Sequence, residues 1–274
     1  MADTYDVLVI GAGPAGEHAA GRLAAAGLRV AIVERELAGG ECSYWGCIPS
    51  KTLLRPGDVL AAARRAPGAA EAVTGPLDAA AAFAQRDYMT SGWRDDGQAA
   101  WLDSNGITLI RGTGRLAGEQ TVEVNTADGA VRRLRADRAV VLATGSSPVM
   151  PPVPGLAEAR PWDNRAATSA KEVPLRLLVL GGGAVGVEMA QAFRRLGSEQ
   201  VVVLEGAEQR RPSGGFAVRW AGVRRRRDSG RGGPQACHRR SRPGARRARA
   251  RAARPGGPGA AGRRRSRRVA VCDR

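Results

Sequence analysis

The chain has 274 residues and a formal net charge of +17, but this charge is concentrated at one end. Residues 1–208 carry 21 Lys and Arg against 24 Asp and Glu, whereas residues 209–274 carry 22 Arg against two Asp. This division excludes a nucleic-acid-binding protein that is basic throughout, and a hydrophobic content of 43% is enough for a packed core.

The first 34 residues predict one βαβ unit. Residues 5–10 form a short apolar run that ends at glycine, which is typical of a buried parallel strand. A glycine-rich turn over residues 11–16 leads into an Ala-rich helix over 17–26, and residues 28–33 form the next strand. This second strand ends at Glu34.

The glycine turn has the spacing of a dinucleotide-binding fingerprint. Gly11 permits a tight turn, Gly13 lets the backbone approach a pyrophosphate, and Gly16 allows the helix to pack closely on the strand. The helix N-terminus would offer N–H groups to the phosphates, and Glu34 would accept hydrogen bonds from an adenosine ribose. The alternative is a glycine turn without a ligand. We therefore expect a dinucleotide at this turn.

Two cysteines follow in the segment GGECSYWGCIPSK, residues 39–51. Cys42 and Cys47 open a predicted helix and can meet as a disulfide within a turn. A helix dipole and a nearby cation would favour the thiolate, which is the nucleophile of disulfide exchange. The alternatives are two buried structural cysteines or half of a zinc site. No second Cys/His pair stands at ligand spacing, so we expect no metal.

The middle of the chain predicts helices and then strands. The Ala/Arg-rich residues 57–102 favour helix. Residues 106–111 and 120–135 alternate in polarity and predict antiparallel strands, with a turn at Asp128-Gly129. Residues 139–145 predict a buried strand that stops at a glycine turn.

The βαβ pattern returns after a proline-rich crossover at residues 151–154. The second copy comprises a strand at 176–180, the glycines Gly181, Gly183 and Gly186, a helix over 187–196, and a strand at 200–204 followed by Glu205. An acid at this position favours a free ribose 2′-hydroxyl, and hence NAD over NADP. A glycine turn without a ligand is again the alternative.

These elements predict an α/β fold. A three-layer, Rossmann-like domain is expected over residues 1–150. An incomplete Rossmann-like domain of one βαβ unit is expected over residues 151–208. No transmembrane run or secretory signal is visible, so cytoplasm is the expected compartment.

Residues 209–274 predict a disordered tail. They contain no Leu or Ile and only four Val, while Arg, Gly, Ala and Pro fill 49 of the 66 positions. Such a composition cannot bury enough apolar surface to offset its ordering entropy. Three interpretations are open: a nucleic-acid-binding tail, an inert extension, and an out-of-frame product of a GC-rich gene. The abrupt change inside a domain favours the third. Even an inert tail of this charge should bind nucleic acid non-specifically.

The ordered motifs resemble the N-terminal portion of the class I pyridine nucleotide–disulfide oxidoreductases, such as dihydrolipoyl dehydrogenase, mycothione reductase and mercuric reductase. The resemblance covers residues 5–208. It depends on GAGPAG with Glu34, on GGECSYWGCIPSK, on LATG at residues 142–145, and on GGGAVGVE with Glu205.

The resemblance implies FAD and NAD(P) as cofactors, with a small disulfide or dithiol as substrate. FAD would be held by Gly11, Gly13, Gly16, Glu34, Lys51, Gly114, Thr144 and Gly145. The nicotinamide dinucleotide would be held by Gly181, Gly183, Gly186 and Glu205. Electrons would pass from NAD(P)H through the flavin to the cysteine pair, or in the reverse direction.

The resemblance also assigns catalytic roles. Cys47 would be the charge-transfer thiol beside the flavin, and Cys42 would be the interchange thiol that attacks the substrate. Lys51 would lie near flavin N5 and pair with Glu188.

Two features depart from the family pattern. Tyr44 and Trp45 stand between the cysteines, where they either reshape the substrate face or pack beside the flavin ring. Family members are also longer and homodimeric, and their interface domain supplies a His-Pro acid/base motif. Nothing after residue 208 resembles these parts. The sequence therefore predicts a truncated chain of impaired activity. The alternative is an inactive fragment that binds polyanions through its arginines.

Overall fold

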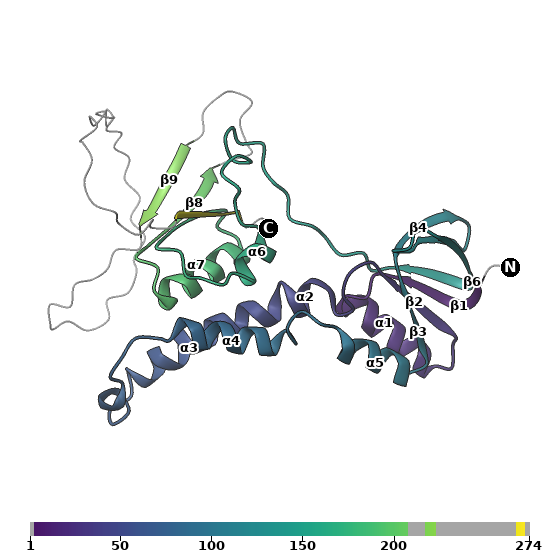
Figure 1. Ribbon diagram of the computed structural model, residues 1–274, viewed down its shortest axis with the longest axis horizontal. Helices are drawn as coiled ribbons and strands as arrows, with labels where there is room; N and C mark the ends of the chain where they lie inside the picture. Colours follow the sequence, from purple (N-terminus) through teal and green to yellow (C-terminus); the bar gives the residue numbers. More distant parts are fainter. Residues whose placement is uncertain (1–2, 208–216, 223–266, 272–274) are drawn as a thin grey trace. The chain divides into compact units, whose positions relative to one another are not determined.

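The structure is a computed structural model that describes residues 3–207, 217–222 and 267–271 (Figure 1). The described strands form two sheets, each with parallel neighbours and flanking helices. This arrangement confirms the predicted α/β, Rossmann-like class. The division at residue 150 stays a prediction.

No helix within the described ranges is both long enough and apolar enough to cross a membrane.

The first sheet has six strands in the order β3-β2-β1-β6-β5-β4. They are β1 (Asp3–Ile10), β2 (Val30–Glu34), β3 (Ile107–Arg111), β4 (Thr113–Gly118), β5 (Thr121–Asn125) and β6 (Val131–Leu142). The first four strands in this order are parallel, and β5 and β4 continue the sheet as antiparallel neighbours. The strands predicted at 5–10 and 28–33 are confirmed with shifts of one or two residues at their ends.

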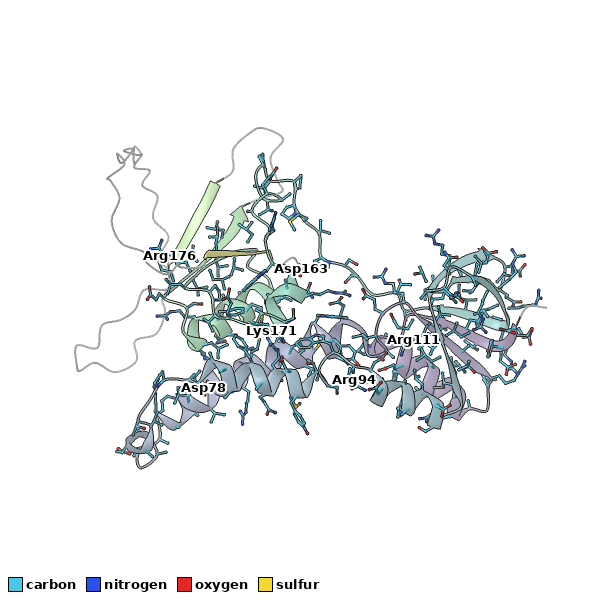
Figure 2. The ribbon with its side chains drawn as sticks, viewed as in Figure 1. Asp78, Arg94, Arg111, Asp163, Lys171 and Arg176 are labelled. Atoms are coloured by element: carbon cyan, nitrogen blue, oxygen red, sulfur yellow. The ribbon has the colours of Figure 1, made fainter. Side chains whose placement is uncertain are left out.

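Five α-helices belong to this half of the chain. They are α1 (Pro14–Ala25), α2 (Gly40–Tyr44), α3 (Cys47–Ala63), α4 (Ala79–Met89) and α5 (Asp96–Ser104), with a 3-10 turn at Ala70–Ala72. The helical prediction for residues 57–102 is thus confirmed in outline. Asp78 caps the N-terminus of α4, because its carboxylate accepts hydrogen bonds from the backbone N–H groups of Ala80 and Ala81 (Figure 2).

Successive residues of β1 enter two different hydrophobic clusters, because side chains alternate across a strand. Val7 and Val9 pack with residues of α1 and α5, while Leu8 and Ile10 pack with residues of β5 and β6. Both faces of β1 are therefore buried, which explains an apolar run without alternation.

The structure corrects two predictions in this sheet and confirms a third. Strand β3 is parallel to β2, because the chain crosses over through helices before it returns to the sheet. The antiparallel hairpin predicted over residues 120–135 is confirmed, because β5 pairs antiparallel with β6 across the turn at Asp128-Gly129. Strand β4, which pairs antiparallel with β5, was not predicted. Residues 139–142 end the long strand β6 instead of forming a separate buried strand. Leu142, which the prediction buries, is 59% exposed.

The second sheet has the order β10-β7-β8-β9. Its strands are β7 (Arg176–Leu180), β8 (Gln200–Ala207), β9 (Ala217–Gly222) and β10 (Arg267–Val271), and its helices are α6 (Asn164–Thr168) and α7 (Ala184–Leu196). Strands β7 and β8 are parallel, and α7 connects them, as the second βαβ pattern predicts. The side chain of Asp163 accepts a hydrogen bond from the backbone N–H of Ala166 and so caps α6 (Figure 2).

Two segments of the predicted disordered tail are strands. Strand β9 pairs antiparallel with β8, and β10 pairs parallel with β7. Both segments interrupt the arginine-rich sequence with Val and Ala, and each lies beside a strand whose edge would otherwise be unpaired. The prediction was wrong for these residues because composition over 66 positions conceals short β-forming runs. The rest of residues 209–274 lies outside the described residues.

Candidate functional site

The turn between β1 and α1 contains the first glycine fingerprint. Gly11 has φ +100°, a left-handed conformation that favours glycine, and a Cβ there would lie 2.2 Å from the carbonyl oxygen of Ala143. A Cβ on Gly16 would lie 1.9 Å from the carbonyl oxygen of Gly11. A Cβ on Gly13, by contrast, would meet no atom within 4 Å. Packing therefore requires Gly11 and Gly16, whereas Gly13 leaves open space before the α1 N-terminus.

Glu34 ends β2 and holds its carboxylate against this turn. One carboxylate oxygen accepts a hydrogen bond from the Ala12 N–H at 2.7 Å, and the other accepts one from the Glu36 N–H at 2.8 Å. Each oxygen keeps a second lone pair. The carboxylate is thus fixed in place and can still accept a hydrogen bond from a hydroxyl group.

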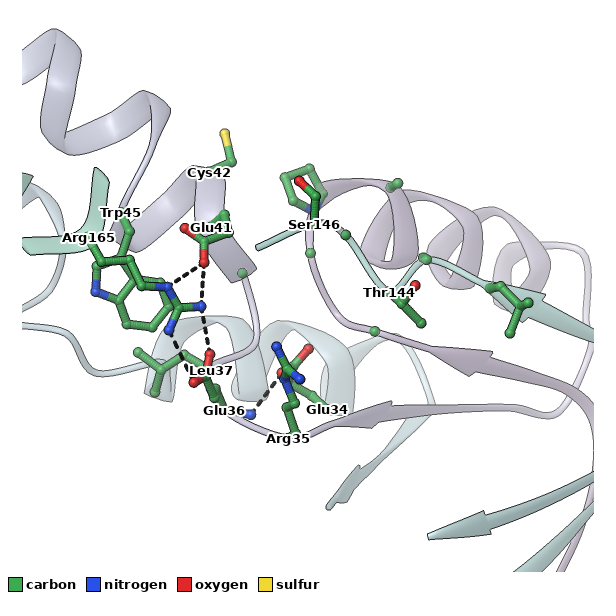
Figure 3. A pocket seen from close by; sticks show the side chains of 18 residues that line it. Glu34, Arg35, Glu36, Leu37, Glu41, Cys42, Trp45, Thr144, Ser146 and Arg165 are labelled. Carbon is green, nitrogen blue, oxygen red and sulfur yellow. Dashed lines mark hydrogen bonds and ion pairs between the residues drawn. The ribbon is translucent and has the colours of Figure 1, made fainter. Parts of the chain in front are cut away.

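A cavity of about 510 Å³ lies in front of the glycine turn (Figure 3). Its wall includes six of the predicted cofactor and redox residues: Gly11, Gly13, Glu34, Cys42, Thr144 and Gly145. A smaller hollow of about 110 Å³ shares Gly11, Glu34 and Thr144 and is lined by Gly114 as well. Gly16 does not line either hollow, since its role is packing. The larger volume is in the range of small-molecule and cofactor sites.

Cys42 and Cys47 are neighbours in space. Cys42 lies in α2 and is half-buried, and Cys47 is the first residue of α3 and is exposed. The structure describes both as free thiols. Burial raises the pKa of the Cys42 thiol, the hydrogen bond with Cys47 raises it further, and the positive charge of Lys51 opposes the rise. The two sulfurs are therefore close enough to interact, and Cys42 lines the cavity.

This environment predicts an alkaline profile for Cys42 alkylation in the reduced protein. A raised pKa leaves the thiol protonated at neutral pH, so the iodoacetamide rate at Cys42 should still be rising at pH 9. Lys51→Met removes the opposing charge and should move the profile to higher pH, whereas Lys171→Met should not. Peptide mass spectrometry over a pH series measures the rate, and a plateau below about pH 8 would contradict the account.

Lys51 and Glu188 form the predicted ion pair. The Lys51 Nζ lies 2.8 Å from both carboxylate oxygens of Glu188 and so links α3 to α7. The two side chains are 61% and 30% exposed, so this pair contributes little to stability by itself. Their predicted role beside a flavin stays a prediction.

The second glycine turn repeats the geometry of the first. Gly181 has φ +105°, and its N–H donates to the carbonyl oxygen of Leu204 at 2.9 Å. In the first turn, the Gly11 N–H donates to the carbonyl oxygen of Val33 at 2.8 Å. Gly183 precedes α7 and Gly186 is buried within it. The Glu205 side chain lies outside the described residues, so its predicted contact with a ribose stays a prediction.

Tyr44 and Trp45 are directed to different surroundings. Tyr44 is buried, and its hydroxyl donates to the Gln98 side-chain oxygen at 3.0 Å. Burial raises the pKa of Tyr44 to about 12. Trp45, in contrast, lines the cavity. Of the two residues, therefore, Trp45 is the one placed to contact a bound molecule.

Sequence reasoning missed Arg165, which reaches the cavity from α6. Its guanidinium binds the carboxylates of Glu36 and Glu41 and lies over the Trp45 ring (Figure 3). The hydrogen bond from Arg165 lowers the pKa of Glu36. Glu36 lies 129 positions before Arg165, so no local spacing connects the two residues.

Comparison with known proteins gives the same picture. Residues 5–215 match the family described as pyridine nucleotide-disulphide oxidoreductase. The chain is 41% identical to dihydrolipoyl dehydrogenase 3 of Pseudomonas aeruginosa over 214 residues, which are 76% of this chain and 45% of the relative. It is 35% identical to mercuric reductase of Staphylococcus aureus over 206 residues, which are 75% of this chain and 36% of the relative.

A solved structure agrees with these sequence matches. The Cu(II) complex of the HOCl-induced flavoprotein disulfide reductase RclA from Escherichia coli is 29% identical and superposes with a TM-score of 0.63, covering 74% of this chain and 42% of that one. The chain thus spans less than half the length of these relatives. The family name joins a pyridine nucleotide to a disulphide, and the solved relative is named a flavoprotein, so FAD and NAD(P)H are the family's cofactors. The chain belongs to the pyridine nucleotide-disulphide oxidoreductase family.

Proposed function

We propose that this chain is the cofactor-binding and redox-active part of an FAD-dependent NAD(P)H–disulfide oxidoreductase that acts on a small disulfide or dithiol. The observation that carries the proposal is a pair of interacting thiols, Cys42 and Cys47, of which Cys42 lines a cavity that begins at a dinucleotide fingerprint. We also propose the cytoplasm as its compartment, because four cysteines in 274 residues do not make a disulfide-rich secreted scaffold.

The cavity residues fit FAD. The open space at Gly13 and the N–H groups at the start of α1 suit a pyrophosphate. The spare acceptor capacity of Glu34 suits a ribose hydroxyl, and Gly114 lines the adjoining hollow where an adenine would lie. Cys42 lines the same cavity as Gly13 and Glu34, and Thr144 borders both hollows.

When bound, FAD supplies two-electron transfer between NAD(P)H and the cysteine pair. Reduction breaks the Cys42–Cys47 bond and consumes two electrons and two protons to give two thiols. The Cys42 thiol then loses its proton and attacks a small disulfide, which forms a mixed disulfide and releases one thiolate. The Cys47 thiol loses its proton in turn and attacks the Cys42 sulfur, which releases the second thiolate and restores the bond. The two released thiolates take up the two protons. Burial and the hydrogen bond with Cys47 raise the pKa of the Cys42 thiol, and the positive charge of Lys51 partly opposes this rise.

The second glycine turn is proposed to hold the nicotinamide dinucleotide. Gly181 and Gly183 leave the start of α7 free for its pyrophosphate, and Gly186 allows that helix to pack closely on β7. Glu205 would favour NAD over NADP. The Lys51–Glu188 pair joins this unit to the cysteine helix and is proposed to lie near the flavin ring.

The proposal is tested by the rate at which the protein reduces a small aromatic disulfide with NADH. The absorbance of the released thiolate measures this rate. The FAD-loaded protein should turn over, and Cys42→Ser or Cys47→Ser should reduce the rate at least 100-fold while FAD remains bound. Serine keeps the size of the side chain but cannot form the disulfide. Ser43→Ala, between the two, is the matched control. Turnover that survives in both cysteine variants would contradict the proposed roles.

The arginine-rich residues 209–274 favour a second candidate, association with polyanions. This segment carries 22 Arg against two Asp. Counterion release then predicts that the segment binds any duplex DNA. This affinity should fall steeply between roughly 50 and 200 mM salt, as it does for other proteins that contact many phosphates. A version of the chain that ends at Glu208 should lose this affinity and keep FAD. Sequence-selective binding that persists at the higher salt would contradict the non-specific assignment.

A further inference from the structure

Arg165 contacts three other residues of the cavity wall, Glu36, Glu41 and Trp45. Its Nη1 and Nη2 atoms lie 3.1 and 2.8 Å from the two carboxylate oxygens of Glu36, and its Nε lies 2.5 Å from Glu41. The guanidinium carbon lies 4.0 Å from the centre of the Trp45 ring. Charge-assisted, bidentate contacts of this kind fix geometry as well as contributing energy (Figure 3).

The two carboxylates belong to different segments of the chain that line the cavity. Glu36 follows the end of β2 by two residues, next to the proposed ribose acceptor Glu34. Glu41 directly precedes Cys42 in α2. Arg165 therefore connects the segment that follows β2 with the segment that leads into Cys42.

Other groups of α6 support the same segment. The Asn164 side chain donates to Glu41 at 3.1 Å, and the Thr168 hydroxyl donates to the carbonyl oxygen of Trp45 at 3.2 Å. The segment from Glu41 to Trp45 is thus held from α6 by three side chains, of which Arg165 is the charged one.

The charges on the wall give Arg165 a second effect. Among the described residues that line the cavity, three carboxylates face two guanidinium groups, those of Arg35 and Arg165. A bound pyrophosphate adds two negative charges. Without Arg165, Glu36 and Glu41 would be unpaired carboxylates beside that pyrophosphate, and like charges disfavour one another.

We propose that Arg165 is a positioning residue that ties Glu36 to Glu41 and makes the negatively charged cavity accept the FAD pyrophosphate. The inference rests on the proposed function, because it takes FAD as the occupant. It assigns to α6, which follows the proline-rich crossover, a part in binding the first dinucleotide.

Equilibrium FAD binding to the full chain, measured by ultrafiltration at several salt concentrations, tests the inference. Arg165→Met should weaken FAD binding about 10- to 100-fold, and added salt should reduce the difference because it screens the exposed carboxylates. Arg165→Lys keeps the positive charge but loses the planar guanidinium that binds two oxygens at once. Its FAD affinity should therefore lie between those of the wild type and Arg165→Met. Arg133→Met is the matched control, since Arg133 pairs with Glu123 on the first sheet and does not line the cavity.

The triple variant Glu36→Gln, Glu41→Gln, Arg165→Met distinguishes the charge effect from a folding effect. It removes the cation together with both carboxylates, so FAD affinity should recover at least tenfold relative to Arg165→Met alone. Equal affinity of Arg165→Met and wild type, or no recovery in the triple variant, would overturn the inference. A wild-type chain that binds no FAD would instead overturn the proposed function.

Discussion

Replacing Gly16 by alanine should lower the free energy of unfolding by about 3 kcal/mol or more and abolish FAD binding. The added Cβ would lie 1.9 Å from the carbonyl oxygen of Gly11, where neither backbone can move without disturbing the β1–α1 turn. The Gly11 turn is itself held against Ala143. Urea unfolding followed by circular dichroism measures the loss.

Gly13→Ala is the matched control for this steric argument. Gly13 has φ −74°, which alanine adopts readily, and an added Cβ meets no atom within 4 Å. Stability should therefore change by less than about 0.5 kcal/mol. FAD affinity should nevertheless fall, because the methyl group occupies the space proposed for the pyrophosphate. Unchanged FAD affinity in Gly13→Ala would place the pyrophosphate elsewhere, and a stable Gly16→Ala protein would contradict the described packing.

Replacing Arg86 by methionine should cost about 3–5 kcal/mol of stability. The Arg86 side chain is completely buried, and its Nη1 donates to the carbonyl oxygens of Thr168 and Ala170 at 2.8 and 2.7 Å. Methionine fills much of the volume but leaves both carbonyls without a donor, and each unsatisfied group costs about 1–3 kcal/mol. Asp87, the ion-pair partner, keeps a second cation in Lys171.

The loss of the Arg86 hydrogen bonds should also weaken the support of the segment between Cys42 and Cys47. The carbonyl oxygen of Thr168 accepts a hydrogen bond from Arg86, and the Thr168 hydroxyl donates one to the carbonyl oxygen of Trp45. Urea unfolding of Arg86→Met and Arg86→Lys tests the argument, with lysine expected to lose less because it retains the charge and one donor. A loss below about 1 kcal/mol in the methionine variant would show that water or other donors satisfy the carbonyls.

Features that depend on neighbouring residues were predictable from the sequence. The strand, glycine turn and helix of each βαβ unit follow from short apolar runs and fixed glycine spacing. The proximity of Cys42 to Cys47 follows from five positions of separation at the start of a helix. The pairing of Lys51 with Glu188 was implied only by the family resemblance.

Features that depend on distant contacts could not be predicted. Arg165 and Glu36 are 129 positions apart, and Arg86 and Ala170 are 84 apart, so only the folded chain brings them together. The parallel direction of β3 depends on the crossover path, which residue periodicity does not encode. The inward orientation of Tyr44 depends on Gln98, 54 positions later.

The oxidation state of the Cys42–Cys47 pair tests the central claim most directly. The protein is oxidised, loaded with FAD and treated with NADH without oxygen, and its thiols are then alkylated and mapped by mass spectrometry. NADH should convert this pair from a disulfide to two alkylated thiols only when FAD is present, while Cys237 and Cys272 serve as internal references. A pair that dithiothreitol reduces but that NADH with FAD leaves bonded would contradict the account.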